Sequence, residues 1–349
     1  MQKYAISFLC FLLALLPEAR AQFPLHLPDA RELADECDTV RISFIGDVMM
    51  HSKQLEFDSR HFLKHINPLL NKADIAVANM EFSLGGSPHS GYPLFSAPDS
   101  YAETMVKDSG IDVMLIANNH ILDRGKKGMR RTLAVYDSLG VRHTGKDHPL
   151  FISRKGIKIA LINCTYGTNI RDDGQEPRVR SLNKEELSIA FEKAKAGKAD
   201  FIIALPHWGE EYQLLHNQEQ ESWAGWMVGM GADAIIGTHP HVVQDSTVID
   251  GSPVFYSLGN SISNMSAINT RLGLIVTLSF TINHISGETR MLPAEYDFSW
   301  CTLPGMLFNN YGTILIKEWA TRRNEWLTPY DYDNMVATLK RVKEATGID

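Results

Sequence analysis

Cysteine is scarce in this chain: the 349 residues contain four, at positions 10, 37, 164 and 301. Cys10 lies in an N-terminal apolar run that we expect to be removed, which leaves three. An odd number cannot form a full disulfide framework, and at most one pair could close after export. None has the spacing of a metal ligand or a nucleophile. The sequence therefore excludes a disulfide-stapled scaffold.

An excess of positive charge is also missing. The formal net charge is −7, and 44% of the residues are hydrophobic. A nucleic-acid-binding protein would usually carry a basic face, and a disordered chain would have fewer apolar residues. We therefore expect a globular protein with no nucleic-acid partner, in which any anionic ligand is held locally.

No hydrophobic run reaches the roughly 20 residues needed to span a bilayer. The apolar run at residues 4–16 follows Lys3 and precedes Ala19-Arg20-Ala21, an A-x-A cleavage signature. This pattern predicts a signal peptide over residues 1–21, cleaved after Ala21, and hence export to the periplasm or cell surface. The alternative is an uncleaved N-terminal anchor, for which the run is short.

After a polar leader at residues 22–38, apolar runs alternate with helix-like stretches, which is typical of an α/β fold. Strands are predicted at residues 40–45, 75–79, 113–117, 157–163, 201–205, 234–236, 254–257 and 272–282. Helices are predicted at residues 59–70, 101–109, 125–139, 184–196, 218–230 and 331–345. From residue 272 onward we expect a second sheet with antiparallel pairing. We place one domain at 39–325 and a helical extension packed on it at 326–349.

Five apolar, strand-like runs end in short polar clusters. They are RISFIGDVMMH, ADIAVANMEFSLGG, DVMLIANNHILDRG, FIIALPHWGEEY and DAIIGTHPHVVQ. Open α/β sheets place their sites beyond the carboxyl ends of their strands, so we expect these clusters to meet at one edge. Carboxylate, amide and imidazole groups suit divalent cations such as Mn²⁺, Fe²⁺, Zn²⁺ or Mg²⁺. The clusters predict a metal-centred hydrolytic site.

Three of the clusters are weak signals when each is taken alone. Asp47 follows a glycine that lets a carboxylate project, but such pairs are common at turns. Asn79 and Glu81 would share one face of an extended strand, and an ordinary strand end is the alternative. His207 ends another strand, where an imidazole stacked on Trp208 is an equally simple interpretation.

Two clusters are stronger signals. Asn118, Asn119 and His120 make a poor core and a good site, since an amide can ligate through its oxygen and an imidazole can transfer a proton. His239 and His241 can both face one metal; a pair of core or surface histidines is the alternative. Together the five clusters predict a two-metal site, with His120 free to protonate a leaving oxygen.

A basic cluster follows the Asn-Asn-His motif in this otherwise acidic protein. It comprises Arg124, Lys126, Lys127, Arg130 and Arg131. The cluster could attract an anionic polymer or phosphate, and a solvated helix face is the alternative. Glu210, Glu211 and Tyr212 follow His207 and are expected to orient it or to meet substrate. Asn260 is either a rim contact or part of a simple strand-ending turn.

Between Phe44 and Asn260 the motifs GDVM, NMEFSL, ANNHILDRG, HWGEEY, GTHPHVVQ and YSLGN occur in order. This series resembles the capsule-synthesis proteins of the CapA (poly-γ-glutamate PgsA-like) type, in the calcineurin-like metallophosphoesterase superfamily. The resemblance implies a four-layer α/β/β/α sandwich, His120 as the catalytic residue, and metal ligands at Asp47, Glu81, Asn119, His207, His239 and His241. We expect substrate contacts at Asn79, Asn118, Arg124, Glu210, Tyr212 and Asn260.

One motif departs from the superfamily pattern. Where the superfamily has Asp-x-His, this chain has Asp47-Val48-Met49, and a thioether is a poor ligand for a hard divalent ion. His51 or a water could fill the gap, one metal could bind weakly, or the site could hold a single metal. The sequence leaves catalytic competence open.

Three functions are compatible with these features. The first is an exported hydrolase or transferase with two divalent ions, acting on a phosphoester or on an amide-linked cell-surface polymer such as poly-γ-glutamate. The second is a non-catalytic accessory protein whose degenerate metal cleft binds the polymer or a membrane-bound polymer synthase, which Met49 favours. The third is a generic exported binding module with structural histidines, which the ordered motifs disfavour.

Overall fold

The central strands are apolar at most successive positions, so each of the two sheets that they form has two apolar faces. The computed structural model describes residues 37–349, so the predicted signal peptide and residues 22–36 of the leader lie outside the described residues. Residues 38–349 form one compact unit. Within the described part of the chain, no helix is both long and apolar enough to cross a membrane.

The first sheet has nine strands. Their order is β15 (Gly312–Leu315), β14 (Glu295–Thr302), β12 (Leu272–Asn283), β1 (Cys37–Val48), β2 (Ile75–Met80), β3 (Val113–Leu115) and β4 (Arg142–Thr144), with β11 (Asn260–Ile262) beside β1 and β13 (Thr289–Met291) beside β12. Strands β1 to β4 are parallel, and β12 to β15 pair in antiparallel fashion. The carboxyl ends of β1, β2 and β3 therefore lie along one edge.

The second sheet has six strands. Their order is β5 (Leu150–Arg154), β6 (Ile157–Thr165), β7 (Phe201–His207), β8 (Ala234–Ile236), β10 (Ser252–Phe255) and β9 (Ser246–Ile249). The four central strands are parallel, and β5 and β9 are antiparallel edges. This arrangement again brings strand ends, those of β7 and β8, to a common edge.

The two sheets pack face to face through alternate strand positions. Ile42 and Phe44 of β1 share one buried apolar cluster with Ile159 and Leu161 of β6. The intervening residue of β6, Ala160, lies in a different cluster on the opposite face. Because successive strand side chains point to opposite faces, each sheet can bury one face against the other sheet and one against helices.

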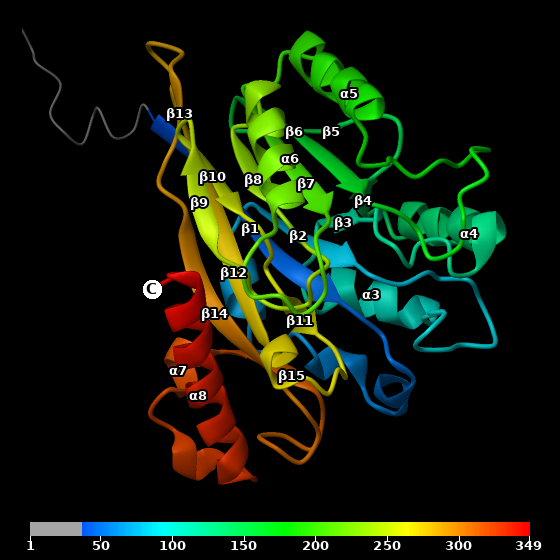
Figure 1. Cartoon of the computed structure of the whole chain (residues 1–349), viewed down its shortest axis with the longest axis vertical. Coiled ribbons are helices and arrows are strands. Elements are labelled where there is room, and N and C mark those ends of the chain that lie inside the picture. Colours follow the sequence, from blue (N-terminus) through cyan, green and yellow to red (C-terminus); the bar gives the residue numbers. More distant parts are fainter. Residues whose placement is uncertain (1–36) are drawn as a thin grey trace, which may run out of the picture. The chain divides into compact units, whose positions relative to one another are not determined.

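The outer faces are covered by helices. Helices α3 (Asp99–Lys107) and α4 (Gly125–Ser138) bury Tyr101 and Met129 with Ile45 of β1. Helices α5 (Lys184–Ala196) and α6 (Gln218–Gly229) bury Phe191 and Met227 on the second sheet. The layers are visible in Figure 1, with α5 and α6 over β6 to β8 and α3 and α4 beyond β2 and β3. The predicted four-layer α/β/β/α sandwich is confirmed.

Two predictions of secondary structure were wrong. The expected helix at residues 59–70 is a 3₁₀ turn, η2 (Ser59–His61), followed by a separate short helix, α2 (Asn67–Leu70). Pro68 explains the break, because a proline inside a helix lacks the N–H donor and clashes with the preceding turn. The antiparallel strands after residue 272 extend the first sheet and do not form a new one, since apolar side chains of β12, like those of β1, face the second sheet. The other predicted helices agree with the structure to within two residues at each end.

The remaining helices are short apart from the last. They are η1 (Ser52–Glu56), η3 (Ile268–Arg271), α7 (Ile316–Trp319), η4 (Arg323–Glu325) and α8 (Pro329–Thr346). Helix α8, red in Figure 1, buries Met335 and Val342 in the cluster between the sheets, together with Trp300 of β14. Asp331 at its start pairs with Arg271, whose Nη2 lies 2.7 Å from Asp331 Oδ2 and whose guanidinium lies 4.5 Å from the Trp300 ring.

This buried ion pair predicts a large stability effect. Asp331→Ala would leave the guanidinium of Arg271 buried and unpaired, so we expect the free energy of unfolding to fall by about 3–5 kcal/mol. The matched control is Asp333→Ala, two residues along the same helix, which removes a solvent-exposed pair with Arg323 and should change little. Urea unfolding measures both. Equal effects would mean that the Arg271 pair does not anchor α8.

Candidate metal centre

The candidate site lies where strand ends of the two sheets meet. Asp47 is the penultimate residue of β1, Glu81 follows β2 directly, and His207 ends β7. Two close backbone approaches require glycine here. A Cβ at Gly46 would lie 1.9 Å from the carbonyl oxygen of Gly259, and one at Gly237 would lie 2.1 Å from that of Tyr256. These glycines let the strands carrying the site approach the neighbouring loop.

Three groups of side chains place their ligand atoms within 4.8 Å of one another. They are Asp47, Glu81 and His241; Glu81, His207 and His239; and Glu211, His239 and His241. Glu81 belongs to the first two groups. The sequence-predicted ligand Asn119 joins the second, because its Oδ1 lies 2.9 Å from His207 Nε2. All six predicted metal ligands are therefore brought together in space.

Hydrogen bonds hold these ligands from behind. His207 Nδ1 lies 3.0 Å from the hydroxyl of Thr238, which leaves Nε2 directed toward Glu81 Oε1 at 3.8 Å. His241 Nδ1 contacts Asp47 Oδ2 at 3.2 Å and Asn260 Oδ1 at 3.0 Å. Thr238 and Asn260 lie outside the predicted ligand set, and an outer partner that fixes an imidazole in this way is typical of metal sites.

The environment of Glu81 shows that the two ligand groups that share it suit a cation. Its side chain is fully buried, and neither carboxylate oxygen has a hydrogen-bond partner. Burial, and then the nearby Asp47 carboxylate, raise the pKa of Glu81 well above its usual range. A buried carboxylate without a partner is costly unless it is protonated or meets a cation. The site thus has a place for positive charge, and the described side chain nearest to it that could carry one is His241, whose Nε2 lies 3.6 Å from Glu81 Oε1.

The imidazoles are suited to the same ion. Burial, and then neighbouring histidines, lower the pKa of His207 well below its usual range and that of His239 to about 3. Both rings are therefore neutral near pH 7 and keep a lone pair for ligation. The Nδ1 atom of His239 is buried and has no hydrogen-bond partner. Carboxylate, amide and neutral imidazole together fit a divalent cation.

His120 is held by a residue that the sequence analysis missed. Its Nδ1 lies 2.7 Å from Asp123 Oδ2, which also accepts a 2.7 Å hydrogen bond from the Phe95 backbone N–H. The ring packs edge-on against Phe95, with ring centroids 4.6 Å apart. His120 also contributes to lowering the pKa values of His207 and His239, after burial and the other histidines. The carboxylate three residues after the histidine was the available sequence signal.

The predicted substrate contacts divide into buried and exposed residues. Asn79, Asn118 and Asn260 are buried amides bonded to other site residues. Asn79 Nδ2 donates to Asp47 Oδ1 at 2.8 Å, and Asn118 Nδ2 donates to the Met80 carbonyl at 2.8 Å. In this structure these amides shape the site from within.

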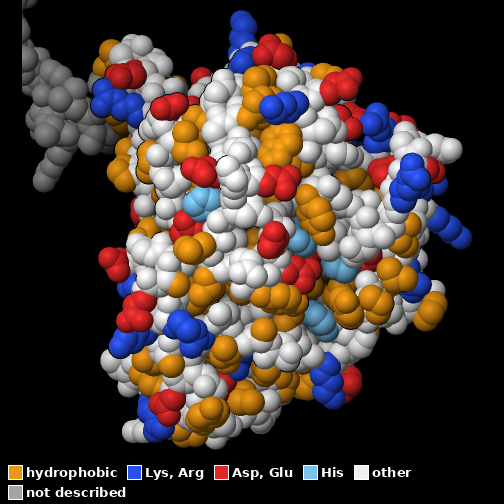
Figure 2. All heavy atoms as spheres, in the orientation of Figure 1, with side chains coloured by type: hydrophobic (Ala, Val, Ile, Leu, Met, Phe, Trp, Pro, Cys, Tyr) orange, Lys and Arg blue, Asp and Glu red, His pale blue; other side chains and the backbone are white. Residues whose placement is uncertain are grey.

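The exposed residues lie at the mouth of the site. Glu210 is exposed, and Tyr212 is 46% exposed with its ring 6.5 Å from that of His241. Tyr166, which the sequence analysis did not single out, is 50% exposed and its ring lies 4.6 Å from that of His239. Figure 2 shows histidine and acidic side chains close together near the middle of the viewed face, with hydrophobic side chains around them.

The basic cluster on α4 is largely committed to internal partners. Arg124, a predicted substrate contact, donates to the Pro88 carbonyl, and Arg130 donates to the Glu176 carbonyl. Lys126 pairs with Asp172 at 2.5 Å. Arg131 makes two hydrogen bonds to Asp99, of 2.6 and 2.8 Å. The cluster anchors loops around α4, and only Lys127 lacks such a partner among the described residues.

The gap at Met49 is not filled by His51. The Met49 side chain is buried in the apolar cluster beneath α3 and α4. His51 Nδ1 lies 3.1 Å from Gln54 Oε1 and accepts a hydrogen bond from the Asn264 backbone at 3.2 Å. Within the described chain, His51 belongs to none of the three ligand groups.

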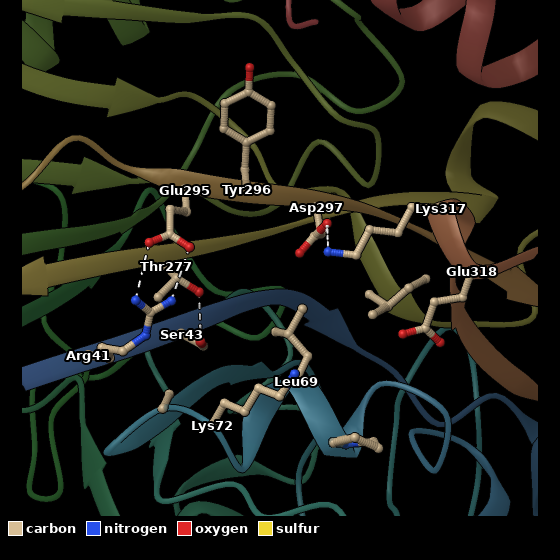
Figure 3. A pocket seen from close by; sticks show the side chains of 13 residues that line it. Arg41, Ser43, Leu69, Lys72, Thr277, Glu295, Tyr296, Asp297, Lys317 and Glu318 are labelled. Carbon is tan, nitrogen blue, oxygen red and sulfur yellow. Dashed lines mark hydrogen bonds and ion pairs between the residues drawn. The ribbon is translucent and has the colours of Figure 1, made fainter. Parts of the chain in front are cut away.

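A separate cavity of about 300 Å³ lies toward the other end of β1 (Figure 3). Arg41 donates to both carboxylate oxygens of Glu295 at 3.1 Å, and Lys317 pairs with Asp297 at 2.5 Å. The charges lining this cavity largely neutralise one another. Arg41 lies six residues before Asp47, roughly 20 Å along an extended strand, so the cavity is distinct from the metal centre.

Comparison with known proteins points to one family. Residues 41–265 match the model described as "Bacterial capsule synthesis protein PGA_cap". The chain is 29% identical over 263 residues to the "Capsule biosynthesis protein CapA" of Bacillus anthracis, covering 69% of this chain and 64% of that protein. It is 28% identical over 258 residues to the "PGA biosynthesis protein CapA" of Bacillus subtilis, covering 68% and 67%.

The chain thus spans just under two thirds of the Bacillus anthracis relative. Among solved structures, it is similar to a phosphatase from Mycoplasma pneumoniae, with 13% identity and a TM-score of 0.46. That comparison covers 75% of this chain and 93% of the phosphatase.

Proposed function

The chain belongs to the bacterial capsule synthesis protein family, and from this premise we propose that it is an exported, metal-dependent hydrolase that processes a cell-surface polymer. The proposed substrate is an amide-linked polymer of the poly-γ-glutamate type or a phosphoester. The supporting observation is Glu81, a buried carboxylate without a hydrogen bond, shared by two ligand groups beside His120. The names of the Bacillus relatives support the polymer context.

The proposed cofactor is a pair of divalent ions. Asp47, Glu81 and His241 would hold one, and Glu81, Asn119, His207 and His239 would hold the other. When bound, such ions supply Lewis acidity to a hydrolytic site. The ion could be Mn²⁺, Fe²⁺, Zn²⁺ or Mg²⁺, since this ligand set suits all of them.

The protein's own residues provide proton transfer and positioning. Asp123 holds the Nδ1 side of His120, so Nε2 is the nitrogen that exchanges a proton with the leaving atom. Tyr166 lies beside His239 and Tyr212 beside His241, and both would flank the bound substrate. Glu210 and Tyr212 would contact the substrate at the mouth.

The proposed location is the periplasm or the cell surface. It is supported by the apolar run and the cleavage signature in residues 1–21. A membrane-bound polymer synthase is the proposed partner, reached from the aqueous side or from the membrane surface.

The second candidate function is a non-catalytic polymer-binding accessory protein. Met49 favours it, because the superfamily's imidazole is missing from one side of the metal centre. The basic residues of α4 argue against this accessory function. Most of them bind partners within the protein, so fewer cations are free to bind an anionic polymer.

The test uses residues 22–349 loaded with Mn²⁺. We expect it to shorten poly-γ-glutamate or to hydrolyse p-nitrophenyl phosphate esters, and chelator treatment should abolish the activity. Size-exclusion chromatography measures the polymer length, and absorbance measures nitrophenol release. A fully metal-loaded protein that binds poly-γ-glutamate but hydrolyses neither substrate would support the accessory role.

A further inference from the structure

Glu211 is an exposed carboxylate that none of the predicted roles uses as a ligand. It lies in the loop after β7, and the structure places its carboxylate within 4.8 Å of ligand atoms of His239 and His241. We propose that Glu211 is a metal ligand that takes the place of the imidazole missing at Met49. It would complete the cation site of Asp47, Glu81 and His241. This inference rests on the metal centre of the proposed function.

The two halves of the centre have unequal ligand sets without Glu211. Glu81, Asn119, His207 and His239 give four protein ligands to one half. The other half has three among the described residues, because Met49 is buried in the apolar core and His51 belongs to none of the ligand groups. Mn²⁺ and Mg²⁺ favour oxygen ligands, so an additional carboxylate suits this half better than a thioether.

The backbone holds Glu211 toward the histidine pair. The N–H of Tyr212, the next residue, donates to the Pro240 carbonyl between the two histidines at 2.9 Å. Tyr212, His239 and His241 all have positive φ angles, of 67°, 102° and 59°. Such backbone conformations are unfavourable for residues other than glycine, and they persist where surrounding contacts enforce them. Both loops are therefore fixed in the conformation that brings Glu211 to His239 and His241.

The charge distribution also leaves Glu211 available to a cation. Among the described residues, no Lys or Arg nitrogen lies within ion-pair distance of its carboxylate, whereas Asp99 and Asp172 beside α4 are each paired with a cation. His239, in the same ligand group, is only 3% exposed, and its Nδ1 has no hydrogen-bond partner. A buried orphan nitrogen beside an unpaired carboxylate is the arrangement expected around a metal ion.

The experiment is a titration of chelator-stripped residues 22–349 with Mn²⁺, followed by calorimetry and by electron paramagnetic resonance. We expect two equivalents in the wild type, with spectral features of coupled Mn²⁺ ions. Glu211→Gln should keep one equivalent at wild-type affinity and weaken the other by roughly 10- to 100-fold, with loss of the coupling. The matched control is Glu210→Gln, the adjacent exposed glutamate outside the ligand groups, which should bind both equivalents normally.

The outcomes separate this inference from the proposed function. If Glu211→Gln binds two Mn²⁺ equivalents at wild-type affinity, the proposed role of Glu211 is overturned. Equal weakening of Mn²⁺ binding in Glu210→Gln would also overturn it, because that result would indicate a general charge effect. A single equivalent in the wild type, unchanged in Glu211→Gln, would also overturn it while leaving a mononuclear hydrolase intact. No binding in the wild type would overturn the metal centre itself. Two equivalents that depend on Glu211 without hydrolysis would support the inference and contradict the enzyme.

Discussion

Glu81→Gln is expected to weaken metal binding strongly while making the metal-free protein more stable. Glu81 is shared by two ligand groups, so its loss should weaken both cations by roughly 100-fold or more, beyond the 10- to 100-fold typical of outer residues. In the metal-free protein its carboxylate is buried without a hydrogen bond, and a neutral amide of the same shape is cheaper to bury. The same substitution therefore changes the two properties in opposite directions.

Thermal unfolding with and without Mn²⁺ measures both effects. At a free metal concentration 100 times Kd, one bound ion stabilises the wild type by about 2.7 kcal/mol, which raises Tm by several degrees. Glu81→Gln should start from a higher Tm and gain little from Mn²⁺. Glu210→Gln, which removes an exposed carboxylate at the mouth, should behave as the wild type. A normal Mn²⁺-dependent rise in Glu81→Gln would contradict the placement of the cations around this residue.

His120→Ala is expected to lower kcat by about 10²- to 10⁴-fold without changing the metal content. His120 belongs to no ligand group, and its Nδ1 is bonded to Asp123, so its proposed role is proton transfer and not ligation. Asp123→Asn should also lower kcat, because an amide does not fix the imidazole as a carboxylate does. We expect KM for the polymer to change little in either variant.

Metal analysis and steady-state kinetics on the same preparations check this prediction. Loss of metal together with activity in His120→Ala would show a ligand role. Unchanged hydrolysis in His120→Ala would remove the histidine from the mechanism. If the wild type is inactive and both variants bind polymer as tightly as it does, the accessory function becomes the better account.

Much of the site could be predicted because its residues lie at the ends of strands, which short apolar runs in the sequence identify. Asp47, Glu81 and His207 lie at strand ends, and parallel strands bring their carboxyl ends to one edge whatever the details of packing. The helices on the outer layers follow from apolar periodicity in the same way. The long β14 strand was not predicted, although its residues EYDFSWCT alternate between polar and aromatic side chains, which is a strand pattern.

Other features depend on contacts between distant segments. The basic residues of α4 form a cluster in sequence, but of their partners Asp99 begins helix α3 and Asp172 lies in the loop between β6 and α5. The expected second antiparallel sheet joined the first because β12 packs its apolar face in the same layer as β1. No local pattern distinguishes these alternatives.

The sequence by itself determined the α/β layers and the set of residues that meets at the strand ends, because both follow from short-range periodicity and strand direction. Only the tertiary structure decided that Asp123 holds His120 and that Glu211 reaches the histidine pair. Both depend on turn geometry, and Glu211 depends on a backbone hydrogen bond between loops almost thirty residues apart, Tyr212 to Pro240. The contact between these two loops arises from chain packing, which residue spacing does not encode.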